Sequence, residues 1–283
     1  MCSPYFYVLL HLKSSTDMKK IILITGASSG FGKATAELLS SRGHIVYGTS
    51  RHPQSDTAIR FLQMDVRQPD SIRQGVEQII AAEGRIDVLI NNAGMGIGGA
   101  LELATPEEID LQMGTNFMGC VNLCQAVLPH MRRQRQGRII NLSSIGGVMG
   151  LPYQGFYSAS KFAIEGFTEA LAAEVRGFGI QVSMVEPGDF ATGFTASRRN
   201  SAATAANEDY RDSFARSLSL IEKEEHGGLQ PIVLARRLVH IVECRRPRLR
   251  YVVANLEQRF SVWLKHICPG NWFVGILRDY YKV

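Results

Sequence analysis

The segment Lys20–Gly32 reads KIILITGASSGFG and sets the fold class of the chain. Its residues Ile21–Ile24 form a short apolar run of the buried-strand type, and the glycine-rich part ends that strand. Beyond the turn, Ala34, Leu38 and Leu39 take one face of a helical pattern. A strand, a glycine turn and a helix in this order predict a phosphate-binding arrangement, because bare backbone can approach a pyrophosphate while the helix N-terminus faces its charge.

The spacing of the three glycines in this turn narrows the class of nucleotide-binding protein. They follow the pattern G-x-x-x-G-x-G rather than G-x-G-x-x-G. A P-loop is excluded, because the frame ending at Lys33 would need glycine at Ala27 and serine or threonine at Ala34. We therefore do not expect a nucleotide kinase.

A second informative stretch holds Tyr157 and Lys161, which are four residues apart and so share one face of a helix. An ammonium ~4 Å from a phenol, at an effective dielectric of ~20, supplies about 4 kcal/mol, enough to bring a phenol pKa of about 10 close to neutrality. Ser144 follows the apolar run Arg138–Leu142, where the carboxyl end of a strand presents a hydroxyl to a ligand. The pattern predicts an acid/base pair with a serine beside it; the alternative is a surface tyrosine beside a solvated lysine.

The composition is that of a globular protein with a full core, since 45% of the 283 residues are apolar and 20% are charged. The net charge of +5 is modest, and the basic clusters Arg132–Arg135 and Arg245–Arg248 lack interleaved aromatic residues. This favours solvated loops over a nucleic-acid surface. Five cysteines without close C-x-x-C spacing argue against a disulfide framework and against a metal site, so we expect a reduced, cytoplasmic protein.

Membrane and targeting segments are not expected either. No apolar run reaches the roughly 18–20 residues that a membrane-spanning helix needs. Residues 1–17 lack the basic leader and the cleavage site of a signal peptide. We expect them to be an appendage outside the fold, consistent with an overlong translation start before Met18.

Together these motifs resemble the short-chain dehydrogenase/reductase family. The likeness covers residues 19–255: the turn Thr25–Gly32 is similar to the family's cofactor turn, and Ser144, Tyr157 and Lys161 match its catalytic spacing. The resemblance implies an α/β fold with one doubly wound (Rossmann) parallel sheet of about seven strands and helices on both faces. Residues 18–283 would then form a single domain.

The resemblance also implies the roles of the site residues. Tyr157 would be the general acid/base, Ser144 would hydrogen-bond the substrate carbonyl, and Lys161 would lower the tyrosine pKa and bind the nicotinamide ribose. Asn116 would distort its helix and hold a water that relays protons to the lysine; the alternative is an exposed asparagine. For Asp65, the resemblance implies a contact with the cofactor, and the alternative is a structural role as the N-cap residue of a helix. The cofactor residues so implied are Gly26, Ser28, Ser29, Gly30, Phe31, Gly32, Ser50, Arg51, Asp65, Val66, Asn92, Ala93, Gly94, Tyr157, Lys161, Pro187, Gly188 and Thr192.

The choice of cofactor depends on the end of the second expected strand, His44–Thr49. A carboxylate there would accept hydrogen bonds from the ribose 2′-hydroxyl and repel a 2′-phosphate. No acidic residue lies between Tyr47 and Gln54, and Arg51 offers a planar fork suited to phosphate. We therefore expect NADP(H), with NAD(H) less favoured.

The sequence gives weaker indications of the residues that bind the substrate. Met149, Leu151, Gln154, Phe190 and Phe194 are expected pocket walls, which indicates a small apolar carbonyl compound or alcohol. Residues 193–230 have few apolar anchors and are expected to form a lid. Residues 255–283 carry two helical apolar stripes, for which we favour core packing over the pocket against contact with a membrane surface. This tail is similar to the steroid- and retinol-dehydrogenase branch.

The function predicted is an NADP(H)-dependent oxidoreductase that interconverts a carbonyl and an alcohol. Two alternatives stay open: an NAD-dependent alcohol or steroid dehydrogenase working oxidatively, and a non-catalytic cofactor-sensing regulator on the same fold. Asp189 is left out of the catalytic group, because the Tyr/Lys pair already does the proton work. The helices expected in 106–131 and 157–175 resemble the family's dimer interface, so a homo-oligomer, dimer or tetramer, is expected.

Overall fold

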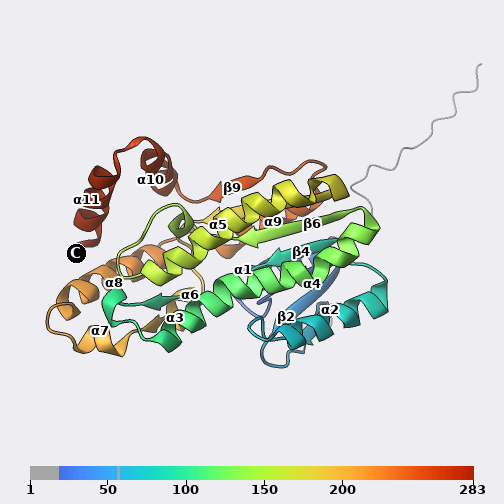
Figure 1. The fold of residues 1–283 in the computed structure, drawn as a ribbon, viewed down its shortest axis with the longest axis horizontal. Helices are drawn as coiled ribbons and strands as arrows, with labels where there is room; N and C mark the ends of the chain where they lie inside the picture. Colours follow the sequence, from blue (N-terminus) through green and yellow to red (C-terminus); the bar gives the residue numbers. More distant parts are fainter. Residues whose placement is uncertain (1–18, 56–57) are drawn as a thin grey trace, which may run out of the picture.

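The computed structural model describes residues 19–55 and 58–283, so the predicted appendage at 1–17 lies outside the described residues. Seven parallel strands form one sheet in the order β3-β2-β1-β4-β6-β7-β9 (Figure 1). Their bounds are β1 Ile21–Ile24, β2 Ile45–Ser50, β3 Arg60–Gln63, β4 Val88–Asn91, β6 Gly137–Leu142, β7 Ile180–Pro187 and β9 Arg250–Val253. The doubly wound sheet predicted from the sequence is confirmed.

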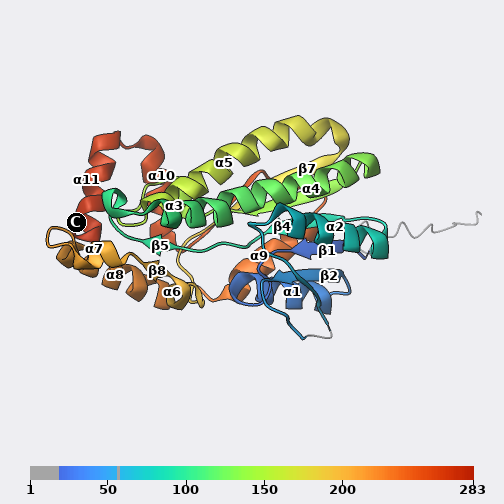
Figure 2. The same cartoon turned by 60° about the horizontal axis from the view of Figure 1, so that its bottom comes forward.

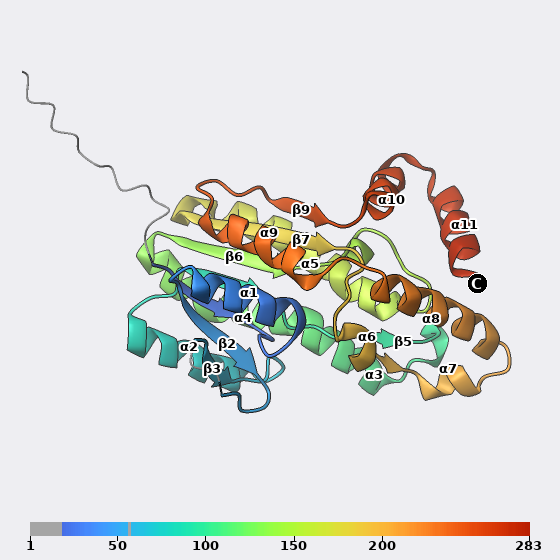
Figure 3. The ribbon, with the colours of Figure 1, turned by 180° about the vertical axis from the view of Figure 1, so that it is seen from behind.

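Helices cover both faces of this sheet (Figures 2 and 3). One face packs on α1 (Gly30–Ser41) and α9 (Pro231–Glu243), and the other on α2 (Pro69–Glu83), α4 (Gly119–Gln134) and α5 (Gly155–Val175). Both faces of every central strand are therefore buried, which is why these strands read as continuous apolar runs.

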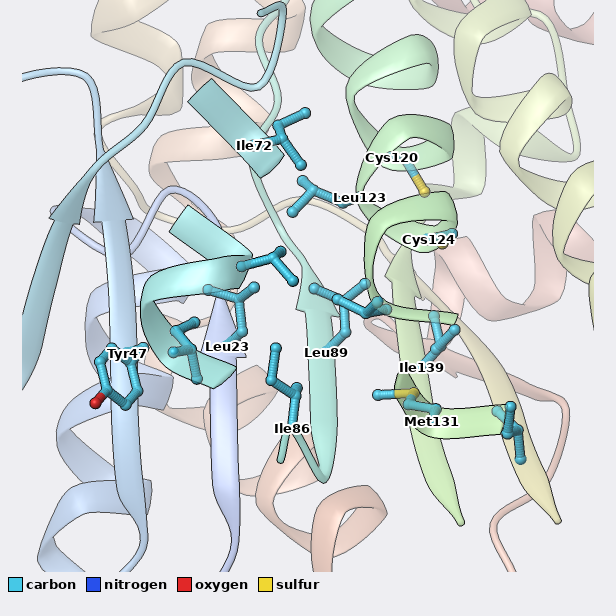
Figure 4. Packing of buried hydrophobic residues seen from close by; sticks show 14 of the residues in the cluster. Leu23, Tyr47, Ile72, Ile86, Leu89, Cys120, Leu123, Cys124, Met131 and Ile139 are labelled. Atoms are coloured by element: carbon cyan, nitrogen blue, oxygen red, sulfur yellow. The ribbon is translucent and has the colours of Figure 1, made fainter. Parts of the chain in front are cut away.

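Side chains within β1 alternate between the two cores. Ile21 and Leu23 belong to the cluster under α2, α4 and α5, and Ile22 and Ile24 to the one under α1 and α9. Figure 4 shows the first cluster, in which Leu123 of α4 lies close to Ile72 of α2. Cys120 and Cys124 of α4 are buried in this cluster as free thiols and contribute to its packing.

The strand order reverses between β1 and β4. The chain runs from β1 outward through β2 and β3, and then returns to place β4, β6, β7 and β9 on the other side of β1. In an open parallel sheet, a ligand binds beyond the carboxyl ends of the strands at such a reversal. The glycine turn after β1 and Asn92–Gly94 after β4 both lie at this point.

The remaining elements lie mostly around the carboxyl edge of the sheet, except η4 (Arg176–Phe178), which precedes β7 at the amino edge. They are β5 Ile97–Gly98, η1 Leu101–Leu103, α3 Pro106–Met113, a π-helical turn at Gly114–Met118, η3 Ile145–Gly147, η4 Arg176–Phe178, α6 Phe194–Ser197, β8 Arg199–Asn200, α7 Ala202–Ala206, α8 Arg211–His226, α10 Leu256–Ile267 and α11 Gly270–Tyr281. β5 pairs with β8 and so connects the loop after β4 to the predicted lid.

The prediction that the C-terminal stripes pack as core is wrong for most of their side chains. Phe273 is buried, and Leu264 and Leu277 are partly buried. The other predicted members are exposed: Leu256, Phe260, Trp263, Ile267, Trp272, Ile276 and Tyr280. The reason is positional, because α10 and α11 stand beyond the end of the sheet and only one side of each helix meets the body of the protein (Figure 1).

Across residues 19–55 and 58–283, no helix has both the length and the apolar character needed to cross a bilayer.

Candidate active site

The turn after β1 is held in a conformation that needs glycine. Gly26 and Gly30 have φ values of 64° and 52°, and a Cβ on Gly32 would lie 2.2 Å from the Gly26 carbonyl oxygen. Asn92 fixes the same turn from β4, because its Nδ2 donates to the carbonyl oxygens of Thr25 at 2.8 Å and Gly26 at 3.1 Å. Backbone can therefore approach a ligand closely here, as a pyrophosphate site requires.

The N-terminus of α1 is open to an anion. Ser29 is the N-cap residue but makes no side-chain cap hydrogen bond, and the first turn carries no acidic residue. The amide groups of this turn therefore keep their hydrogen-bonding capacity and their partial positive charge. Thr192 lies alongside, since a Cβ on Gly30 would come within 3.9 Å of the Thr192 Cβ. These features fit the phosphates of a dinucleotide.

The other residues expected to bind the cofactor gather at the same edge of the sheet. Phe31 packs edge-on against Phe190, with ring centroids 4.9 Å apart. At or just beyond the carboxyl ends of β2, β3, β4 and β7 lie Ser50, Arg51, Asp65, Val66, Asn92, Ala93, Gly94, Pro187, Gly188 and Thr192.

Asp65 does not cap α2, whose N-cap residue is Gln68. Its carboxylate instead accepts a hydrogen bond from the Arg67 amide at 2.9 Å and shapes the loop. Arg51 at the end of β2 is exposed, and among the described residues its guanidinium has no ion-pair partner. A 2′-phosphate there would meet an available cation.

The predicted catalytic residues come together at the carboxyl end of β6. Ser144 begins η3, where its Oγ accepts a hydrogen bond from the Gly146 amide at 3.0 Å and also bonds the Tyr157 hydroxyl. Lys161 lies one helical turn after Tyr157, with its Nζ 5.8 Å from the centre of the phenol ring. The Lys161 Nζ donates to the Leu142 carbonyl oxygen at 2.9 Å.

The pKa of Tyr157 moves in the direction opposite to the one predicted. Burial raises the pKa of Tyr157 to about 12, although the Ser144 hydrogen bond opposes the shift. Burial also lowers the pKa of Lys161 to about 8. Among the described residues, Lys161 donates to the Leu142 carbonyl rather than to the phenol, and burial disfavours its own charge, so it does not offset the effect of burial on the Tyr157 pKa. Tyr157 is consequently protonated at neutral pH.

Asn116 is buried inside the π-helical turn between α3 and α4, so the alternative of an exposed asparagine is wrong. Its Oδ1 accepts from the Met95 amide at 2.9 Å, and its Nδ2 donates to the Met95 carbonyl and to Ser160 Oγ, both at 3.0 Å. A Cβ on Gly94 would lie 3.5 Å from Asn116 Oδ1 and 3.8 Å from Lys161 Nζ, so both side chains face the same glycine. The helix distortion expected here is present; the relay water stays a prediction.

A cavity of about 430 Å³ opens beside these groups. All five predicted substrate contacts line it: Met149, Leu151, Gln154, Phe190 and Phe194. The opposite walls come from three helices near the C-terminus, which add the apolar side chains Ile221, Leu264, Phe273, Ile276 and Leu277. The cavity is therefore apolar over much of its lining and polar where Ser144 and Tyr157 meet it.

Four carboxylates in the lining were not predicted: Asp189, Glu224, Glu225 and Glu257. Lys161 is the basic residue facing them in this lining. Gln258 donates a hydrogen bond to the Asp189 carboxylate, and burial, together with the charges of Glu224 and Glu225, raises the pKa of Asp189 to about 7. Sequence spacing could not reveal this group, because Glu224 and Gln258 reach the pocket from α8 and α10, far along the chain from Asp189.

Glu225 of α8 makes contacts within the predicted lid itself, to residues near the start of the lid. This carboxylate pairs with the buried Arg198 and accepts a hydrogen bond from Thr195 Oγ1 at 2.7 Å. Arg198 also lies over the Phe194 ring, 5.8 Å from its centre. The lid role itself stays a prediction.

Comparison with known proteins decides the family. The family model described as short chain dehydrogenase matches residues 20–203. This chain belongs to the short-chain dehydrogenase/reductase family. It is 59% identical to a 3-ketodihydrosphingosine reductase of Bacteroides thetaiotaomicron over 265 residues, covering 93% of this chain and 98% of that protein. It is 34% identical to the retinol dehydrogenase 8 of Bos taurus, covering 83% and 81% of the two chains.

Solved structures of the family agree with the fold. A short-chain dehydrogenase from Streptomyces avermitilis superimposes with a TM-score of 0.79 at 30% identity, covering 94% of this chain and 97% of that one. Two others, at 25% identity, hold a nicotinamide cofactor: ElxO with NADP (TM-score 0.67) and a Brucella melitensis 3-ketoacyl-(acyl-carrier-protein) reductase with NADH (TM-score 0.68). Each of the two alignments covers 83% of this chain, together with 97% of ElxO and 96% of the Brucella melitensis reductase. A nicotinamide cofactor is therefore supported for this oxidoreductase.

Proposed function

We propose that this enzyme is an NADPH-dependent reductase of a long-chain α-amino ketone of the 3-ketodihydrosphingosine type. The observation that carries the proposal is the lining of the pocket, in which the carboxylates of Asp189, Glu224 and Glu257 accompany the apolar walls. The fourth carboxylate of the lining, Glu225, already pairs with Arg198. The chain as a whole has a net charge of +5, so this acidic character is local. A substrate with a cationic head and an apolar tail matches such a lining.

The chemistry is a carbonyl reduction in which one C–H bond and one O–H bond form. A bound NADPH supplies the hydride to the carbonyl carbon. The Tyr157 hydroxyl gives its proton to the carbonyl oxygen, and Ser144 donates a hydrogen bond to the same oxygen. A phenol whose pKa is raised to about 12 holds its proton at neutral pH, which suits the reductive direction. Lys161 is close enough to stabilise the phenolate left behind.

The amino group of the substrate gives Asp189 a role. In 3-ketodihydrosphingosine the amine is on the carbon next to the ketone, so its ammonium lies close to the group that Tyr157 protonates. The charge of Asp189 acts on Tyr157, and both residues line the same cavity. We infer that the Asp189 carboxylate pairs with this ammonium, while the apolar walls hold the alkyl chain. The relative with 59% identity, named 3-ketodihydrosphingosine reductase, supports this substrate class.

The preference for NADPH over NADH is part of the proposal. It rests on Arg51, which is exposed beside the expected ribose position, and on the lack of an acidic residue between Tyr47 and Gln54. An arginine paired with a 2′-phosphate contributes binding energy that NADH cannot recover.

The predicted homo-oligomer also stays a proposal. Met118 and Phe162 are apolar side chains, each 45% exposed, near the start of α4 and on α5. Burial of such side chains between two copies would be favourable. Light scattering at several protein concentrations tests it.

The substrate proposal is tested by following NADPH oxidation with 3-ketodihydrosphingosine and with a ketone of equal chain length that lacks the amine. We expect turnover of the amino ketone, and Asp189→Asn should raise its KM by about 10- to 150-fold, because a charged hydrogen bond is worth about 1.5–3 kcal/mol. The KM for the ketone without the amine should stay nearly constant.

The matched control is Glu222→Gln, which removes a carboxylate of α8 that does not line the cavity. It should leave both KM values unchanged. Equal effects of Asp189→Asn on the two ketones would reject the ammonium contact. Absence of turnover with any ketone, despite cofactor binding, would favour the sensor alternative, and faster alcohol oxidation with NAD would favour the oxidative one.

A further inference from the structure

Helices α10 and α11 expose eight large apolar side chains. In α10 these are Leu256 (80% exposed), Phe260 (57%), Trp263 (55%) and Ile267 (58%); in α11 they are Trp272 (73%), Val274 (62%), Ile276 (47%) and Tyr280 (49%). We call these eight residues the C-terminal apolar surface. Exposed apolar side chains scattered singly are normal, but a group of this size indicates a binding surface.

The chemistry of this surface fits the boundary between water and lipid. Two tryptophans and a tyrosine, which combine an apolar ring with a polar group, are among its members. The cations of the two helices are Arg259, Lys265 and Arg278, and Lys282 follows directly after α11; the acids are Glu257 and Asp279, of which Asp279 pairs with Arg278. An amphipathic segment with aromatic residues and excess cations binds an interface that carries negative charge.

The same surface is continuous with the substrate pocket. Ile276 and Tyr280 are about half exposed and also line the cavity, so they form part of its rim. Behind them, Leu264 and Leu277 face the cavity from α10 and α11. Figure 3 shows both helices projecting together at the end of the molecule where α8 lies. An apolar path thus leads from the outer face of the helix pair into the pocket.

We propose that α10 and α11 dock on a bilayer surface containing anionic lipids, and that the pocket takes its amphiphilic substrate directly from that bilayer. The docking rests on the exposed surface alone, whereas the delivery of substrate rests on the proposed function. Docking of this kind is peripheral and compatible with a cytoplasmic protein. A second copy of the chain fits less well, because pairing here would cover the pocket rim and bring like charges together.

Flotation with vesicles, without cofactor or substrate, tests the docking separately from catalysis. The full chain should float with vesicles of phosphatidylcholine mixed with phosphatidylglycerol, and less with phosphatidylcholine alone. The triple variant Phe260→Ser/Trp263→Ser/Trp272→Ser should bind the mixed vesicles roughly 100-fold more weakly. Arg278→Glu/Lys282→Glu should weaken binding by about tenfold, and mainly to the anionic vesicles.

The control is Ile232→Ser/Val233→Ser, which removes two exposed apolar side chains of α9 and should leave flotation unchanged. The triple variant should keep its melting temperature and its activity on a ketone soluble in water, but lose activity on substrate presented in vesicles. Failure of the wild-type chain to float, or equal flotation of the triple variant, would overturn the proposal. So would a change from dimer to monomer in the triple variant without any loss of flotation.

Discussion

Tyr157 shows how the function of one side chain depends on its burial. The hydroxyl is bonded to Ser144, the ring lies beside Lys161, and removal from water makes the phenol a weaker acid than in solution. Such a group holds its proton until a developing oxyanion takes it. The role that we propose for the phenol oxygen is therefore in the chemical step rather than in binding.

We expect Tyr157→Phe to lower kcat by at least about 1,000-fold, because the phenol is the proposed source of the proton, while the affinity for NADPH changes little. Stopped assays for turnover and fluorescence titration of NADPH measure the two effects. Tyr153→Phe is the matched control, since that hydroxyl bonds Ser213. Substantial turnover by Tyr157→Phe at saturating substrate would contradict the assignment.

Arg51 is the second residue whose role can be measured alone. Arg51→Ala should raise the KM for NADPH by about 10- to 150-fold, since a charged pair worth about 1.5–3 kcal/mol is lost, and should leave NADH nearly untouched. Adding Ser50→Asp should invert the preference. Steady-state kinetics with both cofactors measure these KM values, and Arg73→Ala is the surface control. An equal rise of KM for NADPH and NADH in Arg51→Ala would show that Arg51 does not bind the 2′-phosphate.

At the scale of elements, Arg250 of β9 ties three parts of the fold together. Its guanidinium pairs with Glu165 of α5 at 2.6 Å, with Glu169 of α5 at 3.0 Å and with the fully buried Glu186 of β7. Burial raises the pKa of both Glu165 and Glu186, and the nearby charge of Arg250 opposes this shift. The tie holds α5, and with it Tyr157, against the edge of the sheet.

Arg250→Met should lower the free energy of unfolding by roughly 3 kcal/mol at neutral pH, because it leaves two buried carboxylates without their cation. The loss should shrink near pH 5, where the carboxyls can hold protons. Urea unfolding at the two pH values measures it. Arg246→Met, which replaces an exposed arginine of the preceding loop, should change the free energy of unfolding little. An equal decrease in both variants would show that the ion pairs of Arg250 do not stabilise the fold.

At the scale of the whole molecule, two buried carboxyls make stability depend on pH. The pKa values of Asp189 and Glu165 are both raised to about 7, from ordinary values of 3.8 and 4.5. Between those limits the folded state keeps protons that the unfolded chain releases. Stability from these groups is therefore lost as pH rises from about 4.5 to 7, the reverse of the usual carboxylate behaviour.

In the wild type the free energy of unfolding should fall as the pH rises across this window. In Asp189→Asn the total fall should be smaller by roughly 2–4 kcal/mol. Denaturant unfolding at intervals between about pH 5 and 7.5 measures the slope, since it reports the difference in bound protons between the two states. Glu222→Gln should keep the wild-type slope. A slope that is the same in Asp189→Asn would mean that Asp189 ionises normally in the folded protein.

The sequence by itself determined the sheet, the glycine turn and the relative positions of the predicted catalytic residues, because each rests on local spacing. A buried parallel strand is a run of apolar residues, and Tyr157 and Lys161 share a helix face at any tertiary arrangement. The choice of family followed from the same short motifs.

Tertiary structure decided the pKa of Tyr157, the acidic lining around Asp189 and the exposure of α10 and α11. The first depends on burial, and no spacing encodes how much water a phenol loses. The second joins Asp189, Glu224 and Gln258 from three separate segments. The third reverses the expected core packing: an amphipathic stripe shows that a helix has an apolar face, but only the position of the helix at the end of the sheet decides whether protein or lipid covers it.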